Sequence, residues 1–304
     1  MILTLGCVRS SLPLQSDPYA SESLCTQLPT QSAVKNNTRC VTFDLWETLI
    51  FDEPHSDEER GRRRYGGLQS VLADHGISLP LDDLKRGYEE SALKLQAVWN
   101  QNDEVPIMEQ IRLIVQLAAG HTITLDPSWN NSLEKAYVDP ILSIPPKLCA
   151  EGPPILQAVR RRGYKIGLIS NTGRSPGSAL RQLLDTYGIL RYFDATIFSN
   201  EVMRRKPDRT IFDRAAHMLG VENNAIVHIG DNPETDFWGA RNADMQAILL
   251  DQTSPDSSRW PPHSLYALSR ANMRSNIAEI EPRCRIETLT DAVDAVDSLF
   301  RIGS

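Results

Sequence analysis

The chain has 304 residues, of which 41% are hydrophobic, 23% charged and 7% aromatic, and its formal net charge is -7. This composition is close to that of average globular proteins, which excludes wholesale disorder, collagen and low-complexity fibres. The acidic balance disfavours nucleic acid and a polybasic membrane anchor, and no apolar run is long enough to cross a bilayer. Five scattered cysteines without a C-x-x-C pair argue against a disulfide framework or a thiolate zinc site. We therefore expect a soluble cytoplasmic protein with no nucleic-acid or membrane partner.

The amino-terminal residues differ from the rest of the chain. Residues 10–37 are rich in Ser, Thr, Gln and Pro and show no hydrophobic periodicity. Residues 1–8 are apolar but lack the basic stretch that precedes the core of a signal peptide, although Cys7 is placed as in a lipoprotein cleavage site. The pattern predicts a loosely ordered extension over residues 1–38 that takes no part in the fold.

A short β-prone run at residues 40–43 ends at Asp44 and predicts the first strand. From residue 55 to residue 149 the apolar residues recur at helical spacing instead. They form four stripes, which lie around Leu68, around Leu95, around Ile111 and between residues 129 and 142. Ser56 and Glu59, three residues apart, predict a capping box at the first helix. The pattern indicates a small helical bundle inserted after the first strand.

Strands and helices alternate over the rest of the chain. Short apolar runs predict strands at residues 165–169, 195–198, 225–229 and 247–250. Helical spacing predicts helices at residues 154–162, 179–187, 209–219, 235–243 and 289–300. Near-continuous apolar strands alternating with helices specify a parallel sheet covered on both faces. Residues 39–54 and 150–304 are therefore predicted to form a doubly wound, Rossmann-like α/β core, with an irregular stretch at residues 252–281.

Polar side chains gather where the predicted strands end, and ligands of open parallel sheets bind beyond these carboxyl ends. The residues at these ends and in the adjoining turns are Asp44, Ser170, Asn171, Lys206, Asp231 and Asp236. Carboxylates facing one another at about 4 Å would repel unless a cation intervened, and oxygen ligands without His or Cys suit Mg²⁺. The hydroxyl, amide and ammonium groups would hold anionic oxygens, so the pattern favours covalent catalysis by a carboxylate on a phosphoryl group.

Four segments of the chain resemble, in order, the four motifs of the haloacid dehalogenase-like (HAD) hydrolases. They are residues 41–49 (VTFDLWETL), 169–172 (ISNT), 205–208 (RKPD) and 229–236 (IGDNPETD). Their spacing is similar to that of the family, and residues 55–149 occupy the usual position of a helical cap. A strand that ends in Asp is common and carries little weight alone, but four motifs in order are specific. The resemblance covers residues 39–300 and implies a HAD-type core with a helical cap.

The resemblance also implies a role for each motif residue. Asp44 would be the nucleophile that forms an aspartyl-phosphate, and it would also bind Mg²⁺. Ser170 and Asn171 would bind the phosphoryl group, while Lys206 would steady both this group and the nucleophile. The other Mg²⁺ ligands would be Asp231, Asp236 and the backbone carbonyl of Trp46.

Trp46 departs from the family pattern, because phosphatases of this family usually carry a second Asp at this position as general acid and base. An indole cannot titrate, so a contribution of about 10²–10⁴-fold should be missing from this side chain. Glu47 is either a displaced acid or a residue that points into solvent or caps the turn, and the second interpretation is favoured. Haloacid dehalogenases also lack the second Asp, since a halide leaves without a proton, but their acidic loop is usually less suited to Mg²⁺ than residues 230–236.

The acidic loop decides between these two chemistries, because two retained carboxylates are costly to hold together without a cation. We therefore expect a Mg²⁺-dependent phosphatase that acts on a small phosphorylated metabolite. One alternative is a metal-independent 2-haloacid dehalogenase-like hydrolase. Another is a catalytically weak binding or regulatory protein in which Trp46 fills the pocket. The sequence does not distinguish a monomer from a homodimer.

For several other residues a structural interpretation is preferred to a functional one. The run Arg60, Arg62, Arg63 and Arg64 could contact an anionic substrate, but such a run is more often a solvated helical face. His228 lies inside an apolar strand and is expected in the core, not at a metal. Trp99 is expected to pack within the helical bundle.

Overall fold

The computed structural model divides the chain into residues 1–36 and a compact unit of residues 37–304, and it describes residues 38–251 and 279–302. The predicted extension at residues 1–38 and the predicted irregular stretch at residues 252–281 lie almost wholly outside the described residues. Within the described part, no helix is both long and apolar enough to cross a membrane.

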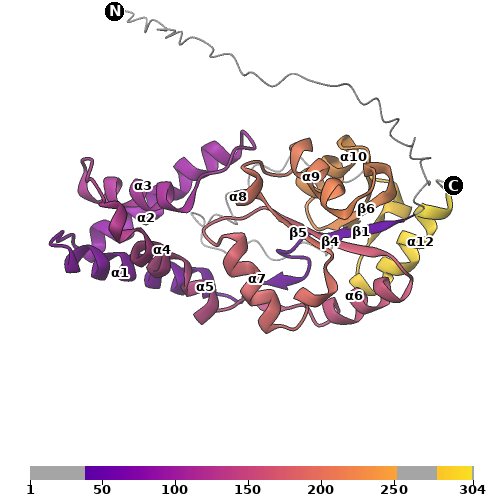
Figure 1. Ribbon diagram of the computed structural model, residues 1–304, viewed down its shortest axis with the longest axis horizontal. Helices are drawn as coiled ribbons and strands as arrows, with labels where there is room; N and C mark the ends of the chain where they lie inside the picture. The colour runs from indigo at the N-terminus through magenta and orange to yellow at the C-terminus, as the bar shows by residue number, and fades with distance from the viewer. Residues whose placement is uncertain (1–37, 252–278, 303–304) are drawn as a thin grey trace, which may run out of the picture. The chain divides into compact units, whose positions relative to one another are not determined.

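A six-stranded parallel sheet forms the centre of the second unit (Figure 1). Its strands are β1 (Cys40–Phe43), β4 (Lys165–Ser170), β5 (Ala195–Phe198), β6 (Ile226–Gly230), β7 (Gln246–Leu250) and β8 (Arg285–Ile286). Their order is β5-β4-β1-β6-β7-β8, and Phe43 of β1 lies between Leu168 of β4 and Ile229 of β6. Because the chain extends the sheet first to one side of β1 and then to the other, the ligand crevice of such a sheet is expected at the carboxyl end of β1.

Helices cover both faces of the sheet, which confirms the predicted doubly wound α/β fold (Figure 1). One face packs against α6 (Gly152–Arg161), α7 (Gly177–Thr186) and α12 (Ala292–Ile302), and the other packs against α9 (Arg209–Leu219) and α10 (Gly239–Asn242). Successive strand residues alternate between the faces, so Leu168 joins one apolar cluster and its neighbour Ile169 joins the other. This double burial explains why the strands are apolar almost throughout.

A second, antiparallel pair of strands, β2 (Ile50–Phe51) and β3 (Lys147–Leu148), frames a helical insert of residues 52–146. Its helices are α1 (Ser56–Asp74), α2 (Leu81–Trp99), α3 (Ile107–Ala119), α4 (Asn130–Val138) and α5 (Pro140–Ser143), with a 3₁₀ turn η1 at Pro127–Trp129. The insert has its own apolar cluster, in which Leu68, Ile111 and Ile114 are fully buried, each contributing about 1.5–3 kcal/mol. Gly87 lets α2 approach α3, since a Cβ there would lie 2.5 Å from the carbonyl oxygen of Ile114.

The predicted helices of the insert are therefore confirmed, whereas the division into domains at residues 39–54, 55–149 and 150–304 stays a prediction. The predicted capping box is wrong. His55 occupies the N-cap position of α1 without a side-chain cap, and Glu59 instead accepts hydrogen bonds from Arg62 and Arg63. Strands β2, β3 and β8 were not predicted, because each has only two residues and is too short to show an alternation of apolar and polar side chains.

Short helical elements complete the described chain. They are α8 (Ser199–Val202), the 3₁₀ turns η2 (Leu190–Tyr192), η3 (Asn223–Ala225), η7 (Pro282–Cys284) and η8 (Leu289–Asp291), and the π-helix η4 (Pro233–Trp238). The helix predicted at residues 235–243 is thus divided into η4 and α10. A π-helical turn is often found at functional sites, and η4 follows directly on the acidic loop after β6.

Candidate active site

A cavity of about 1370 Å³ lies at the carboxyl ends of the central strands and reaches the helical insert. Its wall on the sheet side includes Asp44 after β1, Asn171 after β4 and Asp231 after β6. Arg64 of α1 and Tyr88 of α2 belong to the wall on the side of the insert. The cavity therefore gathers side chains from the sheet and the insert at the switch point where such sheets bind ligands.

Lys206 is the centre of a buried polar group at the bottom of this site. Its ammonium donates to Asp44 Oδ1 at 2.5 Å, to Asp236 Oδ1 at 2.6 Å and to the carbonyl oxygen of Ile169 at 2.8 Å. These three contacts use all three donors of the ammonium. The lysine side chain is 1% exposed, so the two ion pairs are formed away from solvent.

Burial and charge act differently on the two carboxylates. Burial raises the pKa of Asp44 to about 7, even though Lys206 acts in the opposite direction. Burial alone would also raise the pKa of Asp236, but Lys206 and His228 hold it below the usual carboxyl value. Asp236 is therefore the carboxylate that retains its charge most firmly, while a further positive charge near Asp44 would favour its ionised form.

Asp231 completes a group of three carboxylates with Asp44 and Asp236. One oxygen from each residue can be chosen so that all three lie within 4.8 Å of one another. The donors are all oxygens, and the ammonium of Lys206 contacts only two of the three carboxylates, Asp44 and Asp236. An excess of negative charge and an oxygen-only donor set both fit a hard divalent cation. The structure thus brings together the three acidic side chains singled out in the sequence.

The backbone after β6 turns Asp236 back towards the sheet. The side-chain oxygen of Asn232 accepts hydrogen bonds from the backbone amides of Glu234 and Thr235 and so caps η4. The backbone amide of Asn232 donates to Asp236 Oδ2 at 2.9 Å. Gly230 permits this return, because a Cβ there would lie 2.4 Å from Asp236 Cγ. A larger residue at position 230 would displace the carboxylate that contacts Lys206.

His228 supports Asp236 from within the sheet. It is fully buried, as expected, with Nδ1 2.9 Å from Thr42 Oγ1 and Nε2 3.5 Å from Asp236 Oδ1. Burial lowers its pKa, so the ring is neutral. This contact with the acidic group could not be read from the apolar pattern around His228.

Ser170 and Asn171, predicted to bind the phosphoryl group, occupy different positions. Ser170 is fully buried at the end of β4, and its hydroxyl donates to the carbonyl oxygen of Asn171 at 3.3 Å. Asn171 lines the cavity, but its amide holds the backbone of Lys206: Nδ2 donates to the Lys206 carbonyl at 3.0 Å, and Oδ1 accepts from the Lys206 amide at 2.8 Å. The structure thus gives Asn171 a positioning contact, and phosphate binding by both residues stays a prediction.

Trp46 and Glu47 both line the cavity. Trp46 is half-buried and leaves the cavity open, which does not favour the alternative in which it fills the pocket. Glu47 is 9% exposed and has a backbone φ of 57°, so it does not point into solvent, and its expected role in capping the turn stays a prediction. The Trp46 carbonyl as a metal ligand stays a prediction.

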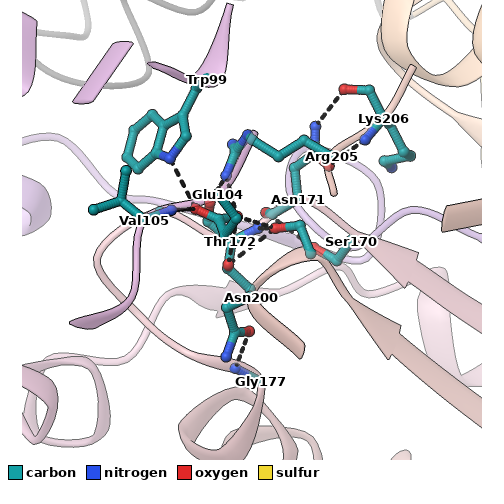
Figure 2. Close-up of polar contacts among 12 residues, drawn as sticks. Trp99, Glu104, Val105, Ser170, Asn171, Thr172, Gly177, Asn200, Arg205 and Lys206 are labelled. Atoms are coloured by element: carbon teal, nitrogen blue, oxygen red, sulfur yellow. Dashed lines mark hydrogen bonds and ion pairs between the residues drawn. The ribbon is translucent and has the colours of Figure 1, made fainter. Parts of the chain in front are cut away.

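A buried network around Glu104 joins the insert to the loops that carry Asn171 and Lys206 (Figure 2). Glu104 lies between α2 and α3, and Figure 2 shows Trp99, Thr172 and Arg205 directed at its carboxylate. Arg205 Nη1 lies 2.6 Å from Glu104 Oε2, and Trp99 Nε1 donates to Oε1 at 2.8 Å. Ser199 Oγ donates to Oε2 at 2.5 Å. Since Arg205 directly precedes Lys206, this network fixes the backbone of the lysine from the side of the insert.

Glu104→Gln is expected to destabilise the protein by about 3 kcal/mol, because it keeps the shape of the side chain but leaves Arg205, whose side chain is only 11% exposed, without its carboxylate. We also expect a lower kcat, since Lys206 follows Arg205. Urea unfolding and steady-state kinetics measure the two effects. Glu109→Gln is the matched control, because Glu109 pairs with Arg112 on the exposed side of α3. A Glu104→Gln protein with the unfolding midpoint and kcat of the parent would contradict a positioning role for the network.

The arginine run on α1 is divided between two environments. Arg62 and Arg63 are exposed, as predicted, but Arg60 and Arg64 are each 2% exposed, so the preferred interpretation is wrong for these two. Positions 60 and 64 continue the four-residue spacing of the buried Leu68 and Leu72, which is the signal that could have identified them. Glu104 lies in a loop, so no periodic spacing in the sequence could have indicated that it is buried.

The chain thus has a doubly wound core, a helical insert and a buried acidic group at the cavity where such sheets bind ligands. A sequence model of the haloacid dehalogenase-like hydrolases matches residues 38–244. The chain therefore belongs to the haloacid dehalogenase-like hydrolases, as its four motifs indicated.

The chain is similar to curated proteins that include a phosphatase and a nucleotidase. It is 33% identical over 103 residues to glyceraldehyde 3-phosphate phosphatase of Methanothermobacter thermautotrophicus. This match covers 33% of this chain and 43% of that protein. It is 26% identical over 249 residues to pyrimidine 5'-nucleotidase YjjG of Escherichia coli. This match covers 76% of this chain and 96% of that protein. The chain spans only 38% and 43% of the lengths of the first two curated relatives.

Among solved structures, 2-haloacid dehalogenase from Pseudomonas syringae pv. Tomato DC3000 is similar in fold, with a TM-score of 0.57 and 20% sequence identity. The match covers 86% of this chain and 99% of that protein. At this identity the likeness shows the shared fold, so the chemistry has to be argued from the site.

Proposed function

We propose that the protein is a Mg²⁺-dependent phosphatase that hydrolyses a small phosphorylated metabolite through an aspartyl-phosphate on Asp44. The observation that carries the proposal is the grouping of Asp44, Asp231 and Asp236 at the bottom of an open cavity, where Lys206 contacts Asp44 and Asp236. A dehalogenase acting on carbon has no need of three carboxylates so close together. The names of two relatives, a glyceraldehyde 3-phosphate phosphatase and a pyrimidine 5'-nucleotidase, support the same reaction class.

In this proposal Asp44 attacks phosphorus and the bond from phosphorus to the ester oxygen breaks. The leaving oxygen takes a proton from water, and a water molecule then cleaves the acyl phosphate, which returns Asp44 and releases phosphate. One water molecule is consumed overall. Lys206 holds Asp44 in place and supplies positive charge beside the transferred group. Asp44, Asp231, Asp236 and the Trp46 carbonyl would hold Mg²⁺, which when bound supplies positive charge that stabilises the phosphoryl oxygens.

The indole of Trp46 sets a preference among leaving groups. Because it can neither donate a proton to the leaving oxygen nor take one from water, good leaving groups should be released faster than alkoxides. Glu47 is buried at the cavity wall and is the nearest chain neighbour that could replace the missing acid. Acyl phosphates are therefore the preferred class of test substrate.

The experiment compares hydrolysis of acetyl phosphate, p-nitrophenyl phosphate and glycerol 2-phosphate with Mg²⁺ and with EDTA. We expect turnover that requires the metal and falls in this order of substrates. Trp46→Asp should raise turnover of glycerol 2-phosphate by about 10²-fold or more. Metal-independent chloride release from 2-chloropropionate would favour the dehalogenase alternative instead. Phosphate binding without any turnover would favour the binding or regulatory protein.

A further inference from the structure

Four cationic side chains are buried in the part of the chain that the structure describes: Arg60, Arg64, Arg174 and Lys206. Two of them have carboxylate partners, because Arg60 contacts Asp52 and Lys206 contacts Asp44 and Asp236. Arg64 and Arg174 form no ion pair with any described carboxylate. They are 2% and 5% exposed. An arginine stays charged at any physiological pH, so two positive charges are enclosed here with no carboxylate in direct contact, although Asp52 and Asp57 act on Arg64 from a greater distance.

Neutral groups hold both guanidinium groups in place. Arg64 donates from Nε to the Tyr137 carbonyl at 3.1 Å, from Nη1 to Tyr88 Oη at 3.2 Å and from Nη2 to Ser175 Oγ at 3.0 Å. Arg174 donates from Nη1 to Tyr137 Oη at 2.7 Å and from Nη2 to the Tyr88 carbonyl at 2.9 Å. These contacts fix the orientation of the groups but do not offset their charge. Each guanidinium also has N–H donors left over beyond these bonds.

The two arginines come from different parts of the fold and share two tyrosines. Arg64 belongs to α1 of the insert, and Arg174 follows β4 in the sheet. Tyr88 and Tyr137 each contact both of them, and the Arg174 guanidinium lies 3.9 Å from the ring centroid of Tyr88. Tyr137 Oη in turn donates to Gln110 Oε1 at 3.0 Å. The pair is therefore a built and oriented cluster rather than two mobile side chains.

Arg64 and Arg174 line the same cavity as Asp44 and Lys206. A buried charge without a partner is unfavourable, so a fold that encloses two of them beside a cavity gains when an anion enters. In the proposed reaction, Lys206 and the Mg²⁺ that the three carboxylates would hold supply positive charge to the phosphoryl group that Asp44 attacks. A negatively charged group that binds Arg64 and Arg174 must therefore be a different part of the substrate.

We propose that Arg64 and Arg174 form a second anion site, which binds a carboxylate or a second phosphate of the substrate at a distance from the phosphoryl group that reacts. This inference rests on the proposed phosphatase function and narrows its substrate to phosphate esters with a further acidic group. Contact with both the insert and the sheet would also couple recognition of that group to the position of the insert over the site.

Matched substrate pairs test the site. D-3-phosphoglycerate and glycerol 3-phosphate differ by a carboxylate, and fructose 1,6-bisphosphate and fructose 6-phosphate differ by a phosphate. In the parent protein we expect kcat/KM to be about 10- to 100-fold higher for the more acidic member of at least one pair, as charge-assisted hydrogen bonds would give. The pair that shows the preference identifies the acidic group as carboxylate or phosphate. A ratio near one in both pairs would overturn the inference.

Arg64→Gln and Arg174→Gln should bring the preferred ratio close to one, and Arg174→Lys should keep part of it because the charge remains. Arg63→Gln is the control, because Arg63 lies on the exposed side of α1 and is not part of the cavity wall. It should keep the parent ratio and the parent rate on p-nitrophenyl phosphate. Equal urea midpoints of the variants exclude a folding defect, and an unchanged ratio in Arg174→Gln would refute the site.

Failure of the phosphatase proposal gives a different result, namely no turnover of p-nitrophenyl phosphate with Mg²⁺. In that case the anion site can be tested without catalysis. Calorimetry measures the binding of malonate to the parent and to Arg174→Gln. Weaker malonate binding to Arg174→Gln would support the site, and equal binding or none in either protein would overturn it.

Discussion

Asp44→Asn is expected to abolish hydrolysis of acetyl phosphate and p-nitrophenyl phosphate, with a loss of about 10⁴-fold or more in kcat. The amide has the shape of the carboxylate but no negative charge to attack phosphorus. Lys206 keeps its contacts with Asp236 and with the carbonyl of Ile169, so the fold should persist. Because burial disfavours the charged form of Asp44, as its raised pKa indicates, removal of this charge should cost little stability.

Steady-state kinetics and urea unfolding measure these two outcomes separately. Asp185→Asn is the matched control, because Asp185 is an exposed residue of α7 and the exchange is chemically the same. A variant that is folded and inactive identifies Asp44 as the nucleophile. Residual activity within about tenfold of the parent would assign the nucleophile to another group.

Lys206→Met is expected to lower kcat by about 10³-fold and to destabilise the protein by about 3–5 kcal/mol. Its ammonium is the buried cation between Asp44 and Asp236, and its removal leaves these carboxylates facing each other. Mg²⁺ should recover part of the lost stability, since a divalent cation supplies the missing charge. The urea midpoint of the variant should therefore depend on Mg²⁺ against EDTA more strongly than that of the parent.

The loss should also depend on pH in a definite direction. Lys206 lowers the pKa of both Asp44 and Asp236, so the folded-state pKa of each rises when the lysine is removed. A carboxyl whose pKa is raised by folding destabilises the folded state when it is ionised and ceases to do so as the pH falls. The variant should thus approach the parent in stability between about pH 8 and about pH 5.

Lys165→Met on β4 is the control for this substitution, because Lys165 is half-buried and donates only to the carbonyl oxygen of Leu219 among the contacts described. It should keep the parent kcat. A Lys206→Met protein with unchanged kcat, or one whose stability falls further as the pH is lowered, would contradict the role assigned to the ammonium.

The layered fold could be predicted because its signals are local. Strands buried on both faces are apolar throughout, and amphipathic helices repeat their apolar residues every three to four positions. The same reasoning placed Asp44, Asn171 and Asp231 at one edge of the sheet, since the carboxyl ends of parallel strands meet there. Elements of two residues, such as β2 and β8, carry too few positions for such a signal.

The environment of each charge could not be predicted in this way. Arg60 and Arg62 look alike in the sequence, but the first is buried against Asp52 and the second is exposed beside Glu59. Phosphate binding by Asn171 stays a prediction, but nothing in the sequence indicated that its amide holds the backbone of Lys206, 35 residues further along the chain. Polar side chains have no period that reveals their partners.

The sequence by itself determined the class of protein, the order of its longer strands and helices and the acidic group with its lysine, because each of these follows from a local pattern or a motif of fixed spacing. Only the tertiary structure decided which charges are compensated. The partner of Arg205 lies 101 residues away in Glu104, while Arg64 and Arg174 meet no described carboxylate. Compensation depends on contacts between segments remote in the chain, and these contacts form only when the insert folds against the sheet.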